Sequence, residues 1–179
     1  QNGSIVMAML RPASAQTIYL GQAFGEAAFR VLLLTAPTAV AVVLIFPVQG
    51  PASSLHAATF VLSLLGSIVL VGALNFIVGA LAIRMKSILG LLRAKFYVQE
   101  LLSGLLVPIT MFPPAVAAAM AWLPFEHIAY TPLRIYLGKL DGVPLAQALA
   151  AQWLWAGFLL AFGSWFWNHM ARKLTVQGG

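Results

Sequence analysis

The chain has 179 residues, of which 61% are hydrophobic and only 8% charged, and its mean hydropathy is +0.94. A water-soluble domain of this length would not tolerate such a surface, so we interpret the chain as an integral membrane protein. The formal charge of +6 does not indicate nucleic-acid binding, because the basic residues stand at the edges of apolar runs, where orientation in a bilayer explains them. The absence of cysteine excludes disulfides and thiolate metal sites.

Residues 1–26 predict two short, weakly amphipathic helices at the membrane surface, with Pro12 separating them. Polar residues recur here too often for a segment in hydrocarbon. The stretch is either a simple interfacial anchor or a docking element for a cytoplasmic partner.

Four later segments have the length and hydropathy of membrane spans. They are residues 29–48, 57–83, 96–112 and 146–167. The second contains no formal charge, and the last carries tryptophans at both ends, as interfacial aromatic belts do. Residues 168–179 form a basic and then polar tail.

Residues 113–138 predict an external re-entrant hairpin. Pro113 and Pro114 forbid helical continuation, and the apolar segment 115–123 that follows has nine residues. At about 1.5 Å per residue it reaches roughly 14 Å, against a hydrocarbon core of about 30 Å. Such a segment enters the membrane and returns, and it needs cover from neighbouring helices.

The basic residues predict the orientation. Eight of the ten lysines and arginines fall on one side, and only Arg134 and Lys139 fall on the other. The positive-inside rule then places both ends of the chain in the cytoplasm and the hairpin outside.

Polar groups in or near the spans are the candidate functional residues. Asn75 is either a hydrogen-bonding partner for another helix or a substrate contact, and Glu100 is either an interfacial carboxylate or a cavity-facing one. The candidate residues of a translocation path or gate are Asn75, Glu100, Ser103, Gly104, Pro108, Pro113 and Pro114.

The sequence offers no catalytic or metal site. His56, His127 and His169 lie in three separate regions, so no metal-ligand spacing exists. A serine hydrolase built from Ser103, His127 and Asp141 is disfavoured, because Ser103 does not stand in a nucleophile-elbow sequence. There is also no phosphate-binding loop, so we expect no nucleotide on this chain.

Several strings, in this order, resemble the permeases of type-two ATP-binding-cassette (ABC) exporters. They are GSIVMAMLRP (3–12), SGLLVPITMFP (103–113), WLPF (122–125), YTPLRIYLG (130–138) and VQGG (176–179). The closest resemblance is to the bacterial subfamily with about six spans and no nucleotide-binding domain in the same chain.

The resemblance implies an all-α, polytopic membrane helix bundle, with four full spans and the hairpin here and two further spans before Gln1. It implies a dimer of identical or related chains in the bacterial cytoplasmic (inner) membrane. Separate ATPase subunits would carry ATP and Mg²⁺, leaving this chain without a cofactor. The residues implied to contact the ATPase are Gly3, Ile5, Met9, Leu10, Arg11 and Pro12.

Two other functions stay open. An ion-coupled secondary carrier usually shows internal repeats and ion-binding carboxylates at the midplane, and here we find no repeat and only Glu100 as a candidate. A non-transporting assembly subunit of a membrane complex is the other alternative.

Overall fold

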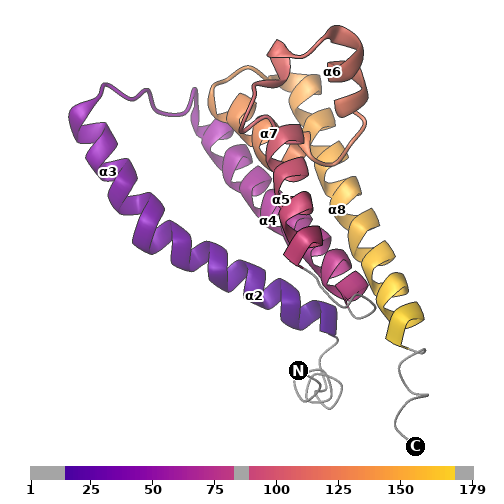
Figure 1. Ribbon diagram of the computed structural model, residues 1–179. Helices are drawn as coiled ribbons and strands as arrows, with labels where there is room; N and C mark the ends of the chain where they lie inside the picture. The colour runs from indigo at the N-terminus through magenta and orange to yellow at the C-terminus, as the bar shows by residue number, and fades with distance from the viewer. Residues whose placement is uncertain (1–14, 83–88, 172–179) are drawn as a thin grey trace, which may run out of the picture. The chain divides into compact units, whose positions relative to one another are not determined.

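The computed structural model describes residues 15–82 and 89–171, and every regular element in these ranges is a helix (Figure 1). Three of the described helices are long and apolar enough to cross a membrane, namely Ala15–Ile45, Ser54–Leu81 and Gly142–Met170. The predicted all-helical membrane fold is therefore confirmed. The chain divides into two compact units, Gln1–Val48 and Gln49–Gly179, which are described separately.

The first unit contains one continuous helix made of α2 (Ala15–Arg30), the π-helical segment η1 (Val31–Thr35) and α3 (Ala36–Ile45). The sequence suggested a surface segment ending at 26 and a separate span over 29–48. The chain is instead helical across that boundary, because no proline interrupts it and the Glu26–Arg30 ion pair, 2.6 Å at i,i+4, supports the helix there. The helix ends at Ile45, before the extended backbone that precedes a proline.

The π-helical segment accommodates Pro37. The backbone N–H of Ala36 donates to the carbonyl of Val31, five residues back, and the Thr38 hydroxyl donates to the carbonyl of Leu34 at 2.6 Å. A widened turn of this kind relieves the clash and the missing donor that proline introduces. Figure 1 shows the helix curving along this segment.

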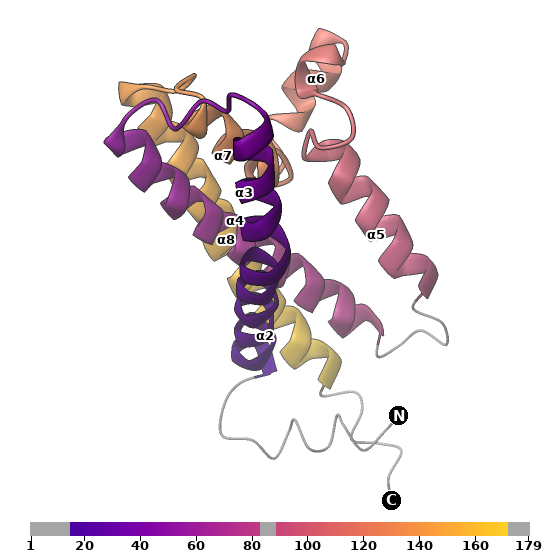
Figure 2. The same ribbon diagram turned by 90° about the vertical axis from the view of Figure 1, so that its left-hand side faces the viewer.

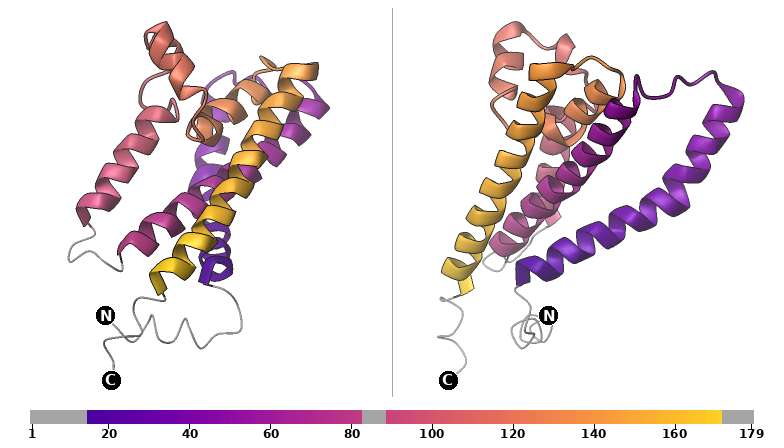
Figure 3. Two further views of the ribbon diagram at one scale, coloured as in Figure 1. Left: turned by 90° about the vertical axis from the view of Figure 1, so that its right-hand side faces the viewer. Right: turned by 180° about the vertical axis from the view of Figure 1, so that it is seen from behind.

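The second unit is built on two long helices, α4 (Ser54–Ala82) and α8 (Gly142–Ala171), which lie side by side in Figures 2 and 3. Both begin a few residues before the predicted spans 57–83 and 146–167. The centre of their contact is a cluster of small and aliphatic side chains. The buried cluster is Val69, Leu70, Ala73, Ala156 and Leu159. In a bilayer such close packing, and not water exclusion, drives helices together.

Helix α5 (Leu89–Leu102) differs from the predicted third span, 96–112. It ends at Leu102, ten residues before the predicted end of 96–112. The reason is Gly104, whose φ of +82° lies in the left-handed region and ends the helix. At about 1.5 Å per residue the fourteen described residues of α5 reach roughly 21 Å, short of the membrane core.

The predicted hairpin consists of two short helices, α6 (Pro114–Met120) and α7 (Glu126–Tyr136), with the 3₁₀ turn η2 (Ile109–Met111) before them. Figures 2 and 3 show α6 beyond the end of α5. Helix α7 packs mainly against α4 and also touches α8.

Candidate functional site

A polar stripe runs along one face of α5 and continues onto Ser103, the residue after the helix ends. Lys95, Gln99 and Ser103 follow each other at intervals of four residues, which places them one above the other on a helix. Gln99 and Ser103 are buried, and the Oε1 atom of Gln99 makes no hydrogen bond with any residue that the structure describes. A buried carbonyl oxygen without a donor is costly, so this stripe is a notable feature in an otherwise apolar environment.

Asn75 connects this stripe to α4. Its Oδ1 atom accepts a hydrogen bond of 2.6 Å from Nζ of Lys95. Of the two roles that the sequence left open for Asn75, the structure supplies the interhelical hydrogen bond. Glu100, which follows Gln99 in α5, is only partly buried.

The end of α5 packs against the hairpin. Ser103 is fully buried and donates from its hydroxyl to the carbonyl of Glu100 at 3.2 Å. A Cβ atom on Gly104 would lie 3.1 Å from Cγ1 of Ile109 and 3.6 Å from Cβ of Tyr130, which belongs to α7. The candidates Ser103 and Gly104 therefore lie where α5 meets α7.

The three candidate prolines stand at the starts of two short helices. Pro108 precedes η2, Pro113 precedes α6, and Pro114 is the first residue of α6. A proline fits at a helix start because the first N–H groups of a helix have no intrahelical acceptor, so the N–H that proline lacks is not missed there. The prolines therefore divide residues 108–120 into separate turns, as the hairpin prediction requires.

Gln152, which the sequence reading missed, joins three helices. Its Oε1 atom accepts from the Ser63 hydroxyl at 2.8 Å, and its Nε2 atom donates to the carbonyls of Ser63 at 2.9 Å and of His127 at 2.8 Å. The Ser67 hydroxyl, 3.2 Å from the same Nε2 atom, also reaches the His127 carbonyl at 3.2 Å. We call Ser63, Ser67, Gln152 and the His127 carbonyl the Gln152 network.

The network explains the small residues on α4. A Cβ atom on Gly66 would lie only 2.9 Å from Cδ of Gln152, so glycine at this position gives the glutamine room. The signal in the sequence was the depth of Gln152: of the two glutamines in the apolar span 146–167, Gln147 stands at its very start and Gln152 lies farther inside, where a polar group needs a partner. The network fixes α7 to both α4 and α8.

A second polar contact ties the first turn of α4 to the loop before α8. The Nε2 atom of His56 lies 3.1 Å from the carbonyl of Leu140 and 3.2 Å from Oδ1 of Asp141, and its Nδ1 atom lies 2.8 Å from the Ser53 hydroxyl. Nearby, a Cβ on Gly138, whose φ is +64°, would lie 2.5 Å from Cβ of Ala52. Only glycine allows this close approach.

The partners of these groups exclude the hydrolase arrangement. Ser103 donates to a backbone carbonyl, His127 pairs with Thr131, and Asp141 lies beside His56. Within residues 15–82 and 89–171, no group of three histidine or acidic side chains could hold a metal ion. The predicted ATPase contacts at residues 3–12 lie outside the described ranges.

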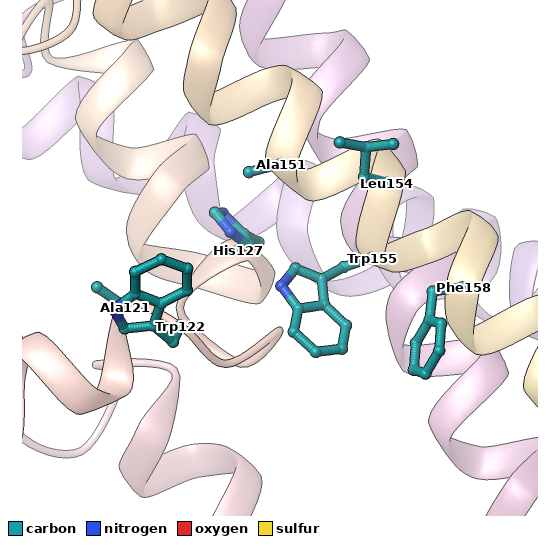
Figure 4. A pocket seen from close by; sticks show the side chains of 7 residues that line it. All are labelled: Ala121, Trp122, His127, Ala151, Leu154, Trp155 and Phe158. Atoms are coloured by element: carbon teal, nitrogen blue, oxygen red, sulfur yellow. The ribbon is translucent and has the colours of Figure 1, made fainter.

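A largely apolar pocket of about 730 Å³ lies between the hairpin and α8 (Figure 4). Aromatic side chains form its walls: Trp122 from the turn after α6, and Trp155 and Phe158 from α8. Ala121, Ala151 and Leu154 complete the apolar lining, and His127 is its polar member.

The fold defines the class of protein. Long apolar helices, a polar network among them and a proline-divided hairpin are the features of a multi-pass membrane protein. A family model described as "ABC-2 family transporter protein" matches residues 1–178. The chain therefore belongs to the ABC-2 transporter family, and it is a membrane permease component of an ABC transporter. No curated protein and no solved structure matches the chain.

Proposed function

We propose that the chain is the permease of an ATP-driven exporter in a bacterial cytoplasmic membrane. It forms the translocation path as a dimer with a second identical or related chain. The observation that carries this proposal is the family match over residues 1–178, which covers nearly the whole chain. Permeases of this family generally leave ATP hydrolysis to a separate subunit, so ATP and Mg²⁺ would be bound there.

The hairpin is the proposed external gate. Its second helix, α7, is fixed by the Gln152 network, whereas its first helix, α6, begins at two consecutive prolines. Prolines at this point prevent α5, η2 and α6 from joining into one continuous helix. The path can therefore be closed on the outside by short segments without a further complete span.

The polar stripe on α5 is the proposed lining of the path. Lys95 is held by Asn75, and the Oε1 atom of Gln99, which has no donor among the residues that the structure describes, offers an acceptor within the membrane region. Polar groups in a span face a bundle interior or a wet cavity far more often than lipid. Such a stripe provides the hydrogen bonds that a substrate loses when it leaves water.

Coupling to the ATPase is assigned to residues 3–12. When ATP brings two ATPase subunits together, that motion would reach the spans through this region. The permease then alternates between two packed arrangements, and nucleotide binding favours one of them.

Copurification and crosslinking test the proposal. The permease should copurify from native membranes with a nucleotide-hydrolysing subunit, and a cysteine at Met9 should crosslink to it. A cysteine at Gly50, in the exposed loop before α4, is the matched control and should not crosslink. Purification without any ATPase would overturn the exporter assignment.

Labelling tests the orientation. An impermeant thiol reagent should label Gly50→Cys from outside the cell, and Asn168→Cys, near the end of α8, only after the membrane is opened. The reverse pattern would place the hairpin in the cytoplasm and remove it as an external gate.

A further inference from the structure

The hydrogen bonds around His127 determine which of its ring nitrogens carries the proton. Nδ1 lies 2.9 Å from the Thr131 hydroxyl. The usual alternative acceptor for that hydroxyl, the carbonyl four residues back, belongs to His127 and already accepts from Gln152 and Ser67. Among the described residues the Thr131 hydroxyl has no other acceptor, so it donates to Nδ1 and the proton of the neutral ring lies on Nε2.

The Nε2–H group is a donor available to the pocket. It makes no hydrogen bond with any residue in the described ranges, and His127 lines the cavity (Figure 4). Burial lowers the pKa of His127, so the ring stays neutral. A neutral N–H in an apolar pocket suits a neutral acceptor, because an anionic one would need a compensating charge that the lining lacks.

The lining of the pocket indicates an apolar ligand with a flexible or flat body. Trp122, Leu154 and Phe158 leave 81%, 73% and 57% of their surfaces exposed, so the pocket is open at its edge and a ligand can enter from the surrounding membrane. Its volume of about 730 Å³ falls within the range of about 300–1,000 Å³ typical of small-molecule sites.

We propose that this pocket binds one acyl chain of an ester lipid from the surrounding bilayer, whose ester carbonyl accepts a hydrogen bond from Nε2 of His127. The ester carbonyl is the neutral acceptor that lies next to an acyl chain in such lipids, so one molecule supplies both features that the pocket requires. The site is independent of the transport function and requires only that the chain is embedded in a membrane.

Ester lipids and their ether-linked analogues provide the test, because the ether analogue keeps the chains and head group but lacks the carbonyl. The purified full chain in detergent is titrated with dioleoylphosphatidylglycerol or its dioleyl ether analogue, and the thermal unfolding midpoint is followed against lipid concentration. The ester lipid should bind about fivefold more tightly, the equivalent of one neutral hydrogen bond.

Three variants complete the test. His127→Phe should bind the two lipids equally, and because the Gln152 network uses only the backbone carbonyl of His127, that network stays in place. His169→Phe, at the exposed cytoplasmic end of α8, should keep the ester preference. Ala151→Phe fills the pocket without removing the histidine and should weaken both lipids. Equal affinities for ester and ether lipid in the unmodified protein, or an unchanged preference in His127→Phe, would overturn the proposal.

Discussion

Replacing Gln152 by methionine should separate hydrogen bonding from packing at the centre of the bundle. Methionine has a similar volume, so the cavity contribution is small. The lost interactions amount to three effective hydrogen bonds, because Oε1 accepts one and the two hydrogens of Nε2 are shared among three acceptors. At about 0.6 kcal/mol for each bond between membrane helices, the free energy of unfolding should fall by about 2 kcal/mol.

The two serines respond differently to this substitution. The buried Ser63 hydroxyl loses its acceptor, the Oε1 atom of Gln152, so about 2 kcal/mol is the smallest loss expected. Ser67 still donates to the Ser63 carbonyl at 3.0 Å, so its hydroxyl is not left without a partner and adds no further penalty. A loss of about 2 kcal/mol corresponds to a decrease of about 25-fold in the folding equilibrium constant.

Reversible unfolding in mixed micelles with increasing dodecyl sulfate, followed by tryptophan fluorescence, measures this change. Gln99→Met is the matched control, since it removes another buried glutamine whose Oε1 atom has no hydrogen-bond partner in the described ranges. Its cost should be well below that of Gln152→Met. If the two variants unfold at the same dodecyl sulfate fraction, the Gln152 network does not stabilise the bundle as argued.

Three further outcomes are expected. Gly104→Ala should lower the free energy of unfolding by about 1–2 kcal/mol for its left-handed backbone, and further because its Cβ crowds Ile109. Gly142→Ala, with φ of +53° and open space around its Cβ, should lose only the backbone part. Equal losses in the same titration would contradict the contact between position 104 and Ile109. Burial lowers the pKa of His127, so the imidazole takes up a proton in the unfolded chain first, and the free energy of unfolding should fall as the pH drops below the ordinary value of 6.5. The measurement uses Glu126→Gln, because burial raises the pKa of the Glu126 carboxyl and its titration acts in the opposite direction. A flat pH profile of stability in Glu126→Gln would contradict the lowered pKa of His127. Replacing Pro113 and Pro114 together by alanine should impair ATP-dependent transport in vesicles while the ATPase subunit still copurifies, and normal transport would remove the hairpin from the mechanism.

The sequence predicted the elements whose cause is local. Pro113 and Pro114 determine where α6 begins, and the long uncharged sequence of α4 favours one long helix. Both elements could therefore be predicted from residue type and length. The prediction failed for α5, because its end depends on the left-handed conformation of Gly104, which becomes visible only once the chain folds against Tyr130.

The candidate site was predictable in part for the same reason. Asn75 was recognised as a polar group in a span, but nothing in the sequence paired it with Lys95, twenty residues later on another helix. Gln152 was missed because an isolated polar residue in an apolar span forms no pattern, and its role arises from Ser63 and Ser67, more than eighty residues earlier in the chain.

The Gln152 network has one consequence for the proposed external gate. Since α7 is hydrogen-bonded into the same body as α4 and α8, that half of the hairpin must travel with the bundle as a rigid piece. Among the described residues, no hydrogen bond of this kind joins α6 to another helix. A movement of the hairpin would therefore involve α6 and the two connections at its ends. The proposed gate would therefore open by movement of α6 about Pro113 and the turn after Met120, while α4, α7 and α8 keep their packing.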